Sequence, residues 1–206
     1  MIEHLESEVS KWLYIEYKHA SSIIGSDRLV FTNIKSREDA RILSSLGIIR
    51  GESFIEIFSP EKILILDPSA PVRLKPEDFL GKETVIVGGI LGDHPPRGRT
   101  KKLITSKVPG ALSRNIGRGQ FSIDGAIYVA KLVSEGIRLE DIPVKRGLHI
   151  RLNSKARIYL PYVYPLKDGK PVLSEDLIKY LTSEEIIREE ENILRTVLLR
   201  DARSMF

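Results

Sequence analysis

Strand-like and helix-like segments alternate along most of this chain. The strand-like segments are short and rich in β-branched or aromatic residues, and the helix-like segments repeat apolar residues every three or four positions. Because parallel strands need a crossover between them, usually a helix, this alternation predicts an α/β fold with a mainly parallel sheet. The 206 residues, 42% of them hydrophobic, suffice for one substantial core. Strands are expected at residues 12–17, 29–31, 63–66, 84–90 and 149–152.

Two of the intervening helices are marked at both ends. The first is expected at residues 36–46, where a Ser-x-x-Asp capping pattern opens the helix and Gly47 follows it as a left-handed cap. The second is expected at residues 122–135, with Ser122 as the N-cap and Gly136 as the stop. Each has an apolar stripe on one face, which predicts that both helices pack on the sheet.

The sequence changes character near residue 155. Prolines and an Asp168-Gly169 turn replace the strand–helix pattern, which predicts an irregular extension or a short hairpin. A capping box at residues 182–185 then opens a last helix with an apolar face. We therefore expect a core, residues 1–154, and a C-terminal extension, residues 155–206, that packs on this core or on a partner.

Composition excludes several kinds of site. The chain has no cysteine, so disulfides, thiolate metal sites, iron–sulfur clusters and cysteine nucleophiles are excluded. His4, His19 and His149 have no partner at metal-ligand spacing, so no metal is expected. The N-terminus lacks the features of a secretion signal, and no segment approaches the roughly 20 apolar residues of a membrane span. The net charge of +4 permits an anionic partner, and a soluble cytoplasmic protein is expected.

Residues 84–100 carry the strongest chemical signal. They read TVIVGGILGDHPPRGRT, which is a strand, a glycine pair and then a polar loop. Ligands of open α/β sheets bind at the carboxyl ends of strands, where this loop must lie. The titratable pair Asp93-His94, followed by two prolines, exceeds what a plain turn needs. A P-loop is excluded, because the spacing is one residue too long, Arg99 replaces the lysine, and the prolines remove amide donors.

A second glycine-rich loop follows within a basic stretch. Residues 97–118 contain seven basic residues and no acidic one, which predicts a surface for a carboxylate, a phosphate backbone or an acidic protein, with a solvated charged face as the alternative. The motif SRNIGRGQFSID at residues 113–124 then leads into the second helix. Two such loops at neighbouring strand ends predict a pocket lined by backbone amides, with an apolar wall from Ile116 and Phe121.

Together these motifs resemble a known enzyme family. The runs ILILDP, PEDF, GGILGDHPPRGRT and RNIGRGQFSIDGAIYVAKLV are similar to SPOUT-class methyltransferases, the family that includes the fungal ribosomal-protein arginine methyltransferase, and the similarity covers residues 12–173. Members have a mainly parallel α/β sheet with helices on both faces and a C-terminal deep trefoil knot that binds S-adenosylmethionine. Most dimerise through the knot, whereas the fungal relatives act as monomers. The resemblance implies this fold, this cofactor and either oligomeric state.

The resemblance also implies roles for particular residues. Methylation of a protonated guanidinium needs a carboxylate that orients it and helps to remove its proton, and Asp93 is the first candidate. His94 would relay the proton or brace the loop, and Arg97 would hold a carboxylate of the cofactor or the charged surroundings of the substrate. The substrate is expected to contact Arg99, Lys101, Lys102, Arg114 and Arg118. The expected cofactor contacts are Leu66, Asp67, Pro68, Gly88, Gly89, Gly92, Asp93, Asn115, Ile116, Gly117, Gln120, Phe121 and Ser122.

Three functions stay open at this point. The first is methylation of an arginine in a ribosomal protein, which the resemblance implies. The second is methylation of tRNA or rRNA by an enzyme of the same fold, because the basic stretch suits phosphates. The third is a module that binds the ribosome or RNA without catalysis. The expected partners are therefore a ribosomal protein, the ribosome or RNA, and no membrane.

Overall fold

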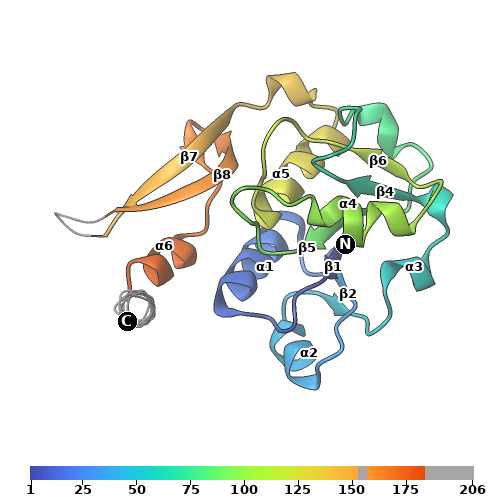
Figure 1. Ribbon diagram of the computed structural model, residues 1–206, viewed down its shortest axis with the longest axis horizontal. Helices are drawn as coiled ribbons and strands as arrows, with labels where there is room; N and C mark the ends of the chain where they lie inside the picture. Colours follow the sequence, from blue (N-terminus) through green and yellow to red (C-terminus); the bar gives the residue numbers. More distant parts are fainter. Residues whose placement is uncertain (153–156, 184–206) are drawn as a thin grey trace, which may run out of the picture.

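A six-stranded sheet forms the centre of the molecule in this computed structural model, which describes residues 1–152 and 157–183. The strand order is β3-β2-β1-β5-β4-β6, and all neighbouring strands are parallel (Figure 1). The expected mainly parallel α/β sheet is therefore confirmed. The strands are β1 (Ile2–His4), β2 (Val30–Thr32), β3 (Ile48–Ile49), β4 (Ile63–Leu66), β5 (Thr84–Gly89) and β6 (Leu112–Arg114).

Both faces of this sheet are covered, as its strand β4 shows directly. All four residues of β4 are buried: Leu64 and Leu66 join one hydrophobic cluster, and Ile63 and Ile65 join another. Because successive strand side chains point to opposite faces, the two clusters lie on opposite sides of the sheet. Helices α1 (Lys11–Ile24), α2 (Arg37–Leu43) and α5 (Ile123–Ser134) contribute to the first cluster, and α3 (Phe54–Ile57) contributes to the second.

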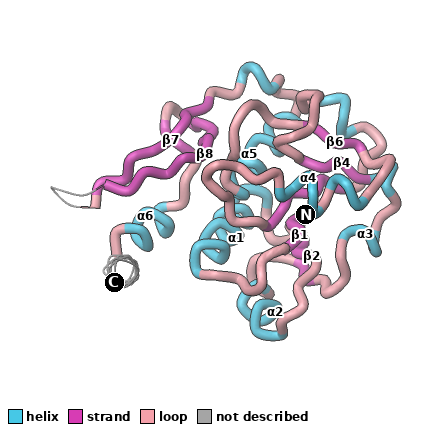
Figure 2. Tube along the Cα trace, in the orientation of Figure 1, coloured by secondary structure: helices cyan, strands magenta, loops and turns pink. Residues whose placement is uncertain are grey.

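Shorter helical segments connect these elements (Figure 2). Helix α4 (Arg99–Leu103) follows the loop after β5 and leads to Ile104, which is fully buried in the second cluster. Single 3₁₀ turns occur at η1 (Pro60–Lys62), η2 (Pro76–Phe79), η3 (Thr105–Lys107) and η4 (Leu139–Asp141). No helix in the described part of the chain is both long and apolar enough to cross a membrane.

The two helices expected from capping signals are present. The Ser122 side chain accepts a hydrogen bond from the Gly125 amide at the start of α5, and Gly136 follows the helix with φ +95°. Ser36 caps α2, but this helix ends at Leu43 and Gly47 is not its left-handed cap. Gly47 instead lies against the backbone of Leu29, where a Cβ would come within 2.5 Å of the carbonyl oxygen.

The strand expected at residues 12–17 is wrong, because these residues belong to α1. Their aromatic and β-branched side chains favour a strand in isolation, but Ser10 caps a helix by accepting a hydrogen bond from the Leu13 amide at 3.3 Å. The helix then buries Leu13 and Tyr17 fully against the sheet. Tertiary packing therefore outweighs local propensity here. The structure also contains two strands that the sequence did not predict, β1 and β6. Each has three residues, which are too few to show a hydrophobic periodicity.

An antiparallel unit follows the parallel sheet and extends from the body of the molecule (Figure 1). It consists of β7 (Val144–Arg151), β8 (Arg157–Lys167) and β9 (Lys170–Pro171), followed by α6 (Glu175–Leu181). The expected Asp168-Gly169 turn joins β8 to β9, with both residues at positive φ. Strand β7, in the expected core, pairs with β8, in the expected C-terminal extension, so this β7–β8 hairpin spans the boundary expected near residue 155. The last helix expected from the capping box falls almost entirely outside the described residues.

Candidate active site

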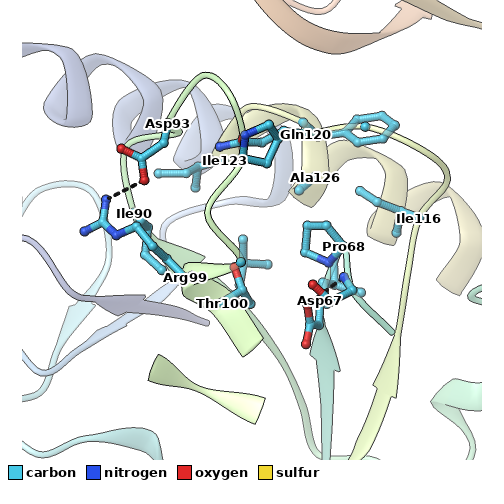
Figure 3. A pocket seen from close by; sticks show the side chains of 18 of the residues that line it. Asp67, Pro68, Ile90, Asp93, Arg99, Thr100, Ile116, Gln120, Ile123 and Ala126 are labelled. Atoms are coloured by element: carbon cyan, nitrogen blue, oxygen red, sulfur yellow. Dashed lines mark hydrogen bonds and ion pairs between the residues drawn. The ribbon is translucent and has the colours of Figure 1, made fainter. Parts of the chain in front are cut away.

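A cavity of about 370 Å³ opens at the carboxyl ends of β4 and β5 (Figure 3). Three loops enclose it: residues 67–69 after β4 (the first loop), residues 90–98 after β5 (the second loop), and residues 116–121 before α5 (the third loop). The volume lies within the range of small-molecule sites, and the place is the one where α/β sheets bind ligands. The two glycine-rich loops of the sequence therefore meet at one cavity.

The cavity has one largely apolar wall and several polar groups. Ile116 from the third loop, together with Ile123 and Ala126 from α5, lines the apolar side (Figure 3). Asp67 lies towards one end of the cavity and Asp93 towards the other. Such a surface suits a ligand with a flat apolar part and a charged part.

Most residues with an expected cofactor role line this cavity, but four do not. Those that line it are Leu66, Asp67, Pro68, Gly88, Asp93, Ile116, Gly117, Gln120 and Phe121. The four that do not are Gly89, Gly92, Asn115 and Ser122.

These four residues have positions that support the loops. Gly89 pairs with His4 of β1, and a Cβ there would collide with the Tyr17 hydroxyl. The Gly92 carbonyl accepts a hydrogen bond of 2.9 Å from the Tyr162 hydroxyl. The Asn115 side chain donates to the Ala70 carbonyl at 2.8 Å and accepts from the Gly117 amide at 3.0 Å. Ser122 caps α5, as described above.

Asp93 carries an unsatisfied oxygen atom at the end of the cavity. Its Oδ2 is buried and has no hydrogen-bond partner in the described part of the structure. The oxygen forms an ion pair with the Arg99 guanidinium, whose Nη1 lies 3.9 Å away, which is too far for a hydrogen bond (Figure 3). A buried carboxylate oxygen without a donor is costly, so this atom is suited to receive one from a ligand.

Arg99 braces the second loop from helix α4. Its Nη1 donates to the Leu91 carbonyl at 3.1 Å, and its Nη2 lies 2.9 Å from the Glu6 carboxylate. The same Glu6 oxygen accepts a hydrogen bond from the Leu91 amide. Arg99 was expected to contact substrate, and the structure places it in the cavity wall with its guanidinium already engaged. The part played by Glu6 has no signal in the sequence, because its partners lie more than 80 residues away.

The other expected catalytic and substrate residues are spread around the cavity. Arg97 lines it and is exposed, whereas His94 is exposed and does not line it. Lys101, Lys102 and Arg118 are also exposed and lie outside the lining. Arg114 makes two contacts with the Asp78 carboxylate, at 2.9 and 2.8 Å, so its guanidinium anchors β6 to the turn at residues 76–79.

Asp67 fixes the first loop from within the fold. Its side chain is almost fully buried and accepts hydrogen bonds from the Ser69 amide at 2.8 Å and the Thr105 hydroxyl at 2.7 Å. These bonds join the end of β4 to the segment after α4. The first loop is thereby tied to the segment that follows the second loop and α4.

A buried acidic pair lies behind the apolar wall, between α1 and α5. Glu16 accepts hydrogen bonds from the Trp12 indole at 2.7 Å and from the Ile123 amide at 3.0 Å. Burial, together with the neighbouring Asp124, raises the pKa of Glu16 to about 8. Asp124 in turn lies 2.6 Å from His19 Nδ1. Sequence reasoning missed Glu16, because the segment that carries it resembled a strand.

Comparison with known proteins gives the family. A family model described as protein arginine N-methyltransferase SFM1-like matches residues 1–187. Protein arginine N-methyltransferase SFM1 of Saccharomyces cerevisiae is 34% identical over 198 residues, covering 87% of this chain and 93% of that protein.

Comparison with solved structures identifies the same family. The crystal structure of the yeast enzyme complexed with SAH has a TM-score of 0.81 and 31% identity, covering 87% of this chain and 92% of that one. The structure complexed with SAM has a TM-score of 0.79 and 30% identity, covering 88% of each chain. The resemblance seen in the sequence is thus confirmed over most of the chain. The chain belongs to the SFM1-like family of protein arginine N-methyltransferases.

Proposed function

We propose that this chain transfers a methyl group from S-adenosylmethionine to an arginine of a ribosomal protein, and that Asp93 receives the guanidinium. The observation that carries the proposal is the buried Oδ2 of Asp93 at one end of the cavity, which has no hydrogen-bond donor among the described residues. The relatives with solved structures, which are complexed with SAM and SAH, support the cofactor. A cytoplasmic location follows from the proposed substrate.

The residues of the cavity fit this cofactor by chemical character. Ile116, Ile123 and Ala126 offer an apolar surface for an adenine ring, and Gly88 and Gly117 expose backbone without a side chain. Asp93, at the other end of the cavity, offers the acceptor guanidinium a carboxylate oxygen that has no hydrogen-bond donor among the described residues. Bound in the cavity, the cofactor supplies an electrophilic methyl group on a sulfonium.

The protein's own contribution is to position and deprotonate the acceptor. A free guanidinium is protonated and has no available lone pair, so a hydrogen bond to Asp93 Oδ2 orients it and draws its proton away. As the new N–CH₃ bond forms and the S–CH₃ bond breaks, the nitrogen loses a proton to this carboxylate. Arg99 and Glu6 hold the second loop in place, because reacting atoms must stay about 3 Å apart and aligned.

The surroundings of the cavity favour a substrate carried on the ribosome. Arg97, Lys101 and Lys102 are exposed near the cavity, and such cations are attracted to a surface rich in phosphate. This attraction guides the enzyme to the ribosome, whereas the acidic Asp93 selects a cationic side chain that enters the cavity. The basic residues and the carboxylate therefore have separate tasks.

Substitution of Asp93 tests its role. Asp93→Asn keeps the shape of the side chain but removes its charge, so methyl transfer is expected to fall by about 10²- to 10⁴-fold. The affinity for S-adenosylmethionine, measured by calorimetry, is expected to stay within about threefold, or less than 1 kcal/mol. Asp27→Asn, at an exposed aspartate between α1 and β2, is the matched control. Methyl transfer at the wild-type rate by Asp93→Asn would show that another group accepts the proton.

The acceptor is identified by labelling. The enzyme transfers labelled methyl from S-adenosylmethionine into a ribosome-containing extract, and the product is divided between protease and ribonuclease. We expect the label to be lost to protease, to survive ribonuclease, and to appear as methylarginine after hydrolysis. Label lost to ribonuclease would move the assignment to RNA methylation.

A further inference from the structure

The antiparallel unit concentrates positive charge at one side of the molecule. Residues 144–171 contain seven lysines or arginines and a single acidic residue, Asp168, although the whole chain has a net charge of only +4. In the part of the chain that the structure describes, none of these basic side chains forms an ion pair with a carboxylate. The charge is therefore available to an external partner.

An exposed aromatic pair lies on the same unit. His149 and Tyr159 face each other across β7 and β8, with ring centroids 4.9 Å apart and planes inclined by 36°. Tyr159 is 54% exposed, which is unusual for a large aromatic side chain. Gly147, at φ +69° in the β-bulge of β7, makes room for this ring, because a Cβ there would lie 2.6 Å from the Tyr159 hydroxyl. The backbone and His149 thus hold Tyr159 in place.

Two arginines extend this surface along the strands. Arg151 and Arg157 are directly paired across β7 and β8, and both are exposed. Like charges in this arrangement destabilise a hairpin unless an anion lies between or beside them. We call His149, Tyr159, Arg151 and Arg157 the hairpin face.

The opposite face of the hairpin formed by β7 and β8 is covered by other parts of the protein. Leu148 and Leu160 are buried in a cluster with Leu177 of α6 and Ile15 of α1. Because alternate residues of a strand point to opposite sides, packing of this inner face leaves the hairpin face outward. Figure 1 shows α6 beside the hairpin, and both strands run outward from the body.

We propose that the hairpin face binds single-stranded RNA. Arg151 and Arg157 would contact phosphates, and an unpaired base would stack on Tyr159. A protein that carries the acceptor arginine is itself cationic at that point, so a basic surface repels it, whereas RNA supplies both the negative charge and flat rings. The inference concerns docking and does not depend on the identity of the methylated residue.

Fluorescence anisotropy on the full chain tests this inference without cofactor or methyl transfer. The probe is a labelled 12-nucleotide oligouridylate, titrated at two salt concentrations. Arg151→Gln/Arg157→Gln removes two phosphate contacts, so the affinity is expected to fall and the slope of log K against log salt to decrease by about 1.4. Tyr159→Leu keeps apolar bulk but no ring, and is expected to weaken binding about 5- to 100-fold. Tyr159→Phe keeps the ring and is expected to bind like the wild type.

Controls separate this surface from other basic parts of the chain. Arg37→Gln/Arg41→Gln on α2 removes the same charge at an exposed helix on a different side of the molecule and is expected to leave binding unchanged (Figure 1). Retained binding of S-adenosylmethionine shows that each variant is folded. The inference is overturned if the probe does not bind, if only Lys101→Gln/Lys102→Gln weakens it, or if a polyglutamate peptide or a duplex RNA competes equally well.

Discussion

Glu16 is a carboxyl group that the fold keeps away from water. Its pKa rises from an ordinary 4.5 to about 8, because burial and Asp124 both disfavour the charged form. The unfolded chain therefore releases this proton at a lower pH than the folded chain does. The stability that protonated Glu16 provides is complete below about pH 4.5 and is lost as the pH rises to about 8.

We expect this linkage to make the free energy of unfolding decrease as the pH rises. Between pH 5 and 9 the wild type should lose on the order of a few kcal/mol in free energy of unfolding, measured by urea denaturation. Glu16→Gln cannot ionise, so its stability should be lower at pH 5 but much less dependent on pH. Glu135→Gln, at the exposed C-cap of α5 in contact with Lys131, should follow the wild-type slope. An unchanged slope in Glu16→Gln would assign the linkage to other groups.

At the scale of elements, the start of α5 connects helix capping to the cavity. Ser122→Ala removes the side chain that accepts from the Gly125 amide, and should cost about 1 kcal/mol in stability. Since Gln120, Phe121 and Ile123 line the cavity, the affinity for S-adenosylmethionine should also fall about fivefold. Thermal unfolding and calorimetry measure the two effects.

A second helix cap gives the matched control. Ser36 caps α2 by accepting from the Glu38 and Asp39 amides, at a distance from the cavity. Ser36→Ala should lose a similar amount of stability and bind the cofactor like the wild type. If both variants lose affinity equally, general destabilisation and not the position of α5 is responsible.

Elements with strong local signals could be predicted from the sequence. The run of four buried residues in β4 and the caps of α2 and α5 are local features, and each marks a real element. By contrast, β1 lies between β2 and β5 at the centre of the sheet, yet its three residues have no detectable period. The cavity loops were found through their glycines, whereas Glu6 and Glu16 depend on contacts 85 and 107 residues away.

At the scale of the whole molecule, one cluster joins the two sheets. Leu148 and Leu160 of the hairpin pack with Ile15 of α1, and Lys18 lies 2.8 Å from Asp176 of α6. We therefore expect both sheets to unfold in one transition. Trp12, the only tryptophan of the chain, packs against this cluster, so its fluorescence reports the junction.

Two probes test this cooperativity. The urea midpoints from Trp12 fluorescence and from far-ultraviolet circular dichroism should coincide. Leu160→Ala should lower stability by about 2–5 kcal/mol, whereas Lys18→Gln, at an exposed ion pair, should cost less than about 1 kcal/mol. A fluorescence midpoint well below the dichroism midpoint would mean that the hairpin and α6 detach first.

Strand β8 contacts the third loop of the cavity and also carries part of the hairpin face. The Val163 amide donates to the Gln120 carbonyl at 2.8 Å, and Val163 bridges to Phe121, so the third loop is hydrogen-bonded to the strand that carries Tyr159. Two ligands that share such an element are subject to thermodynamic reciprocity. Whatever factor a ligand on the hairpin face imposes on the dissociation constant of the cofactor, the cofactor must impose the same factor on the dissociation constant of that ligand. Exchange of spent for fresh cofactor would then change the lifetime of a complex formed at the hairpin face.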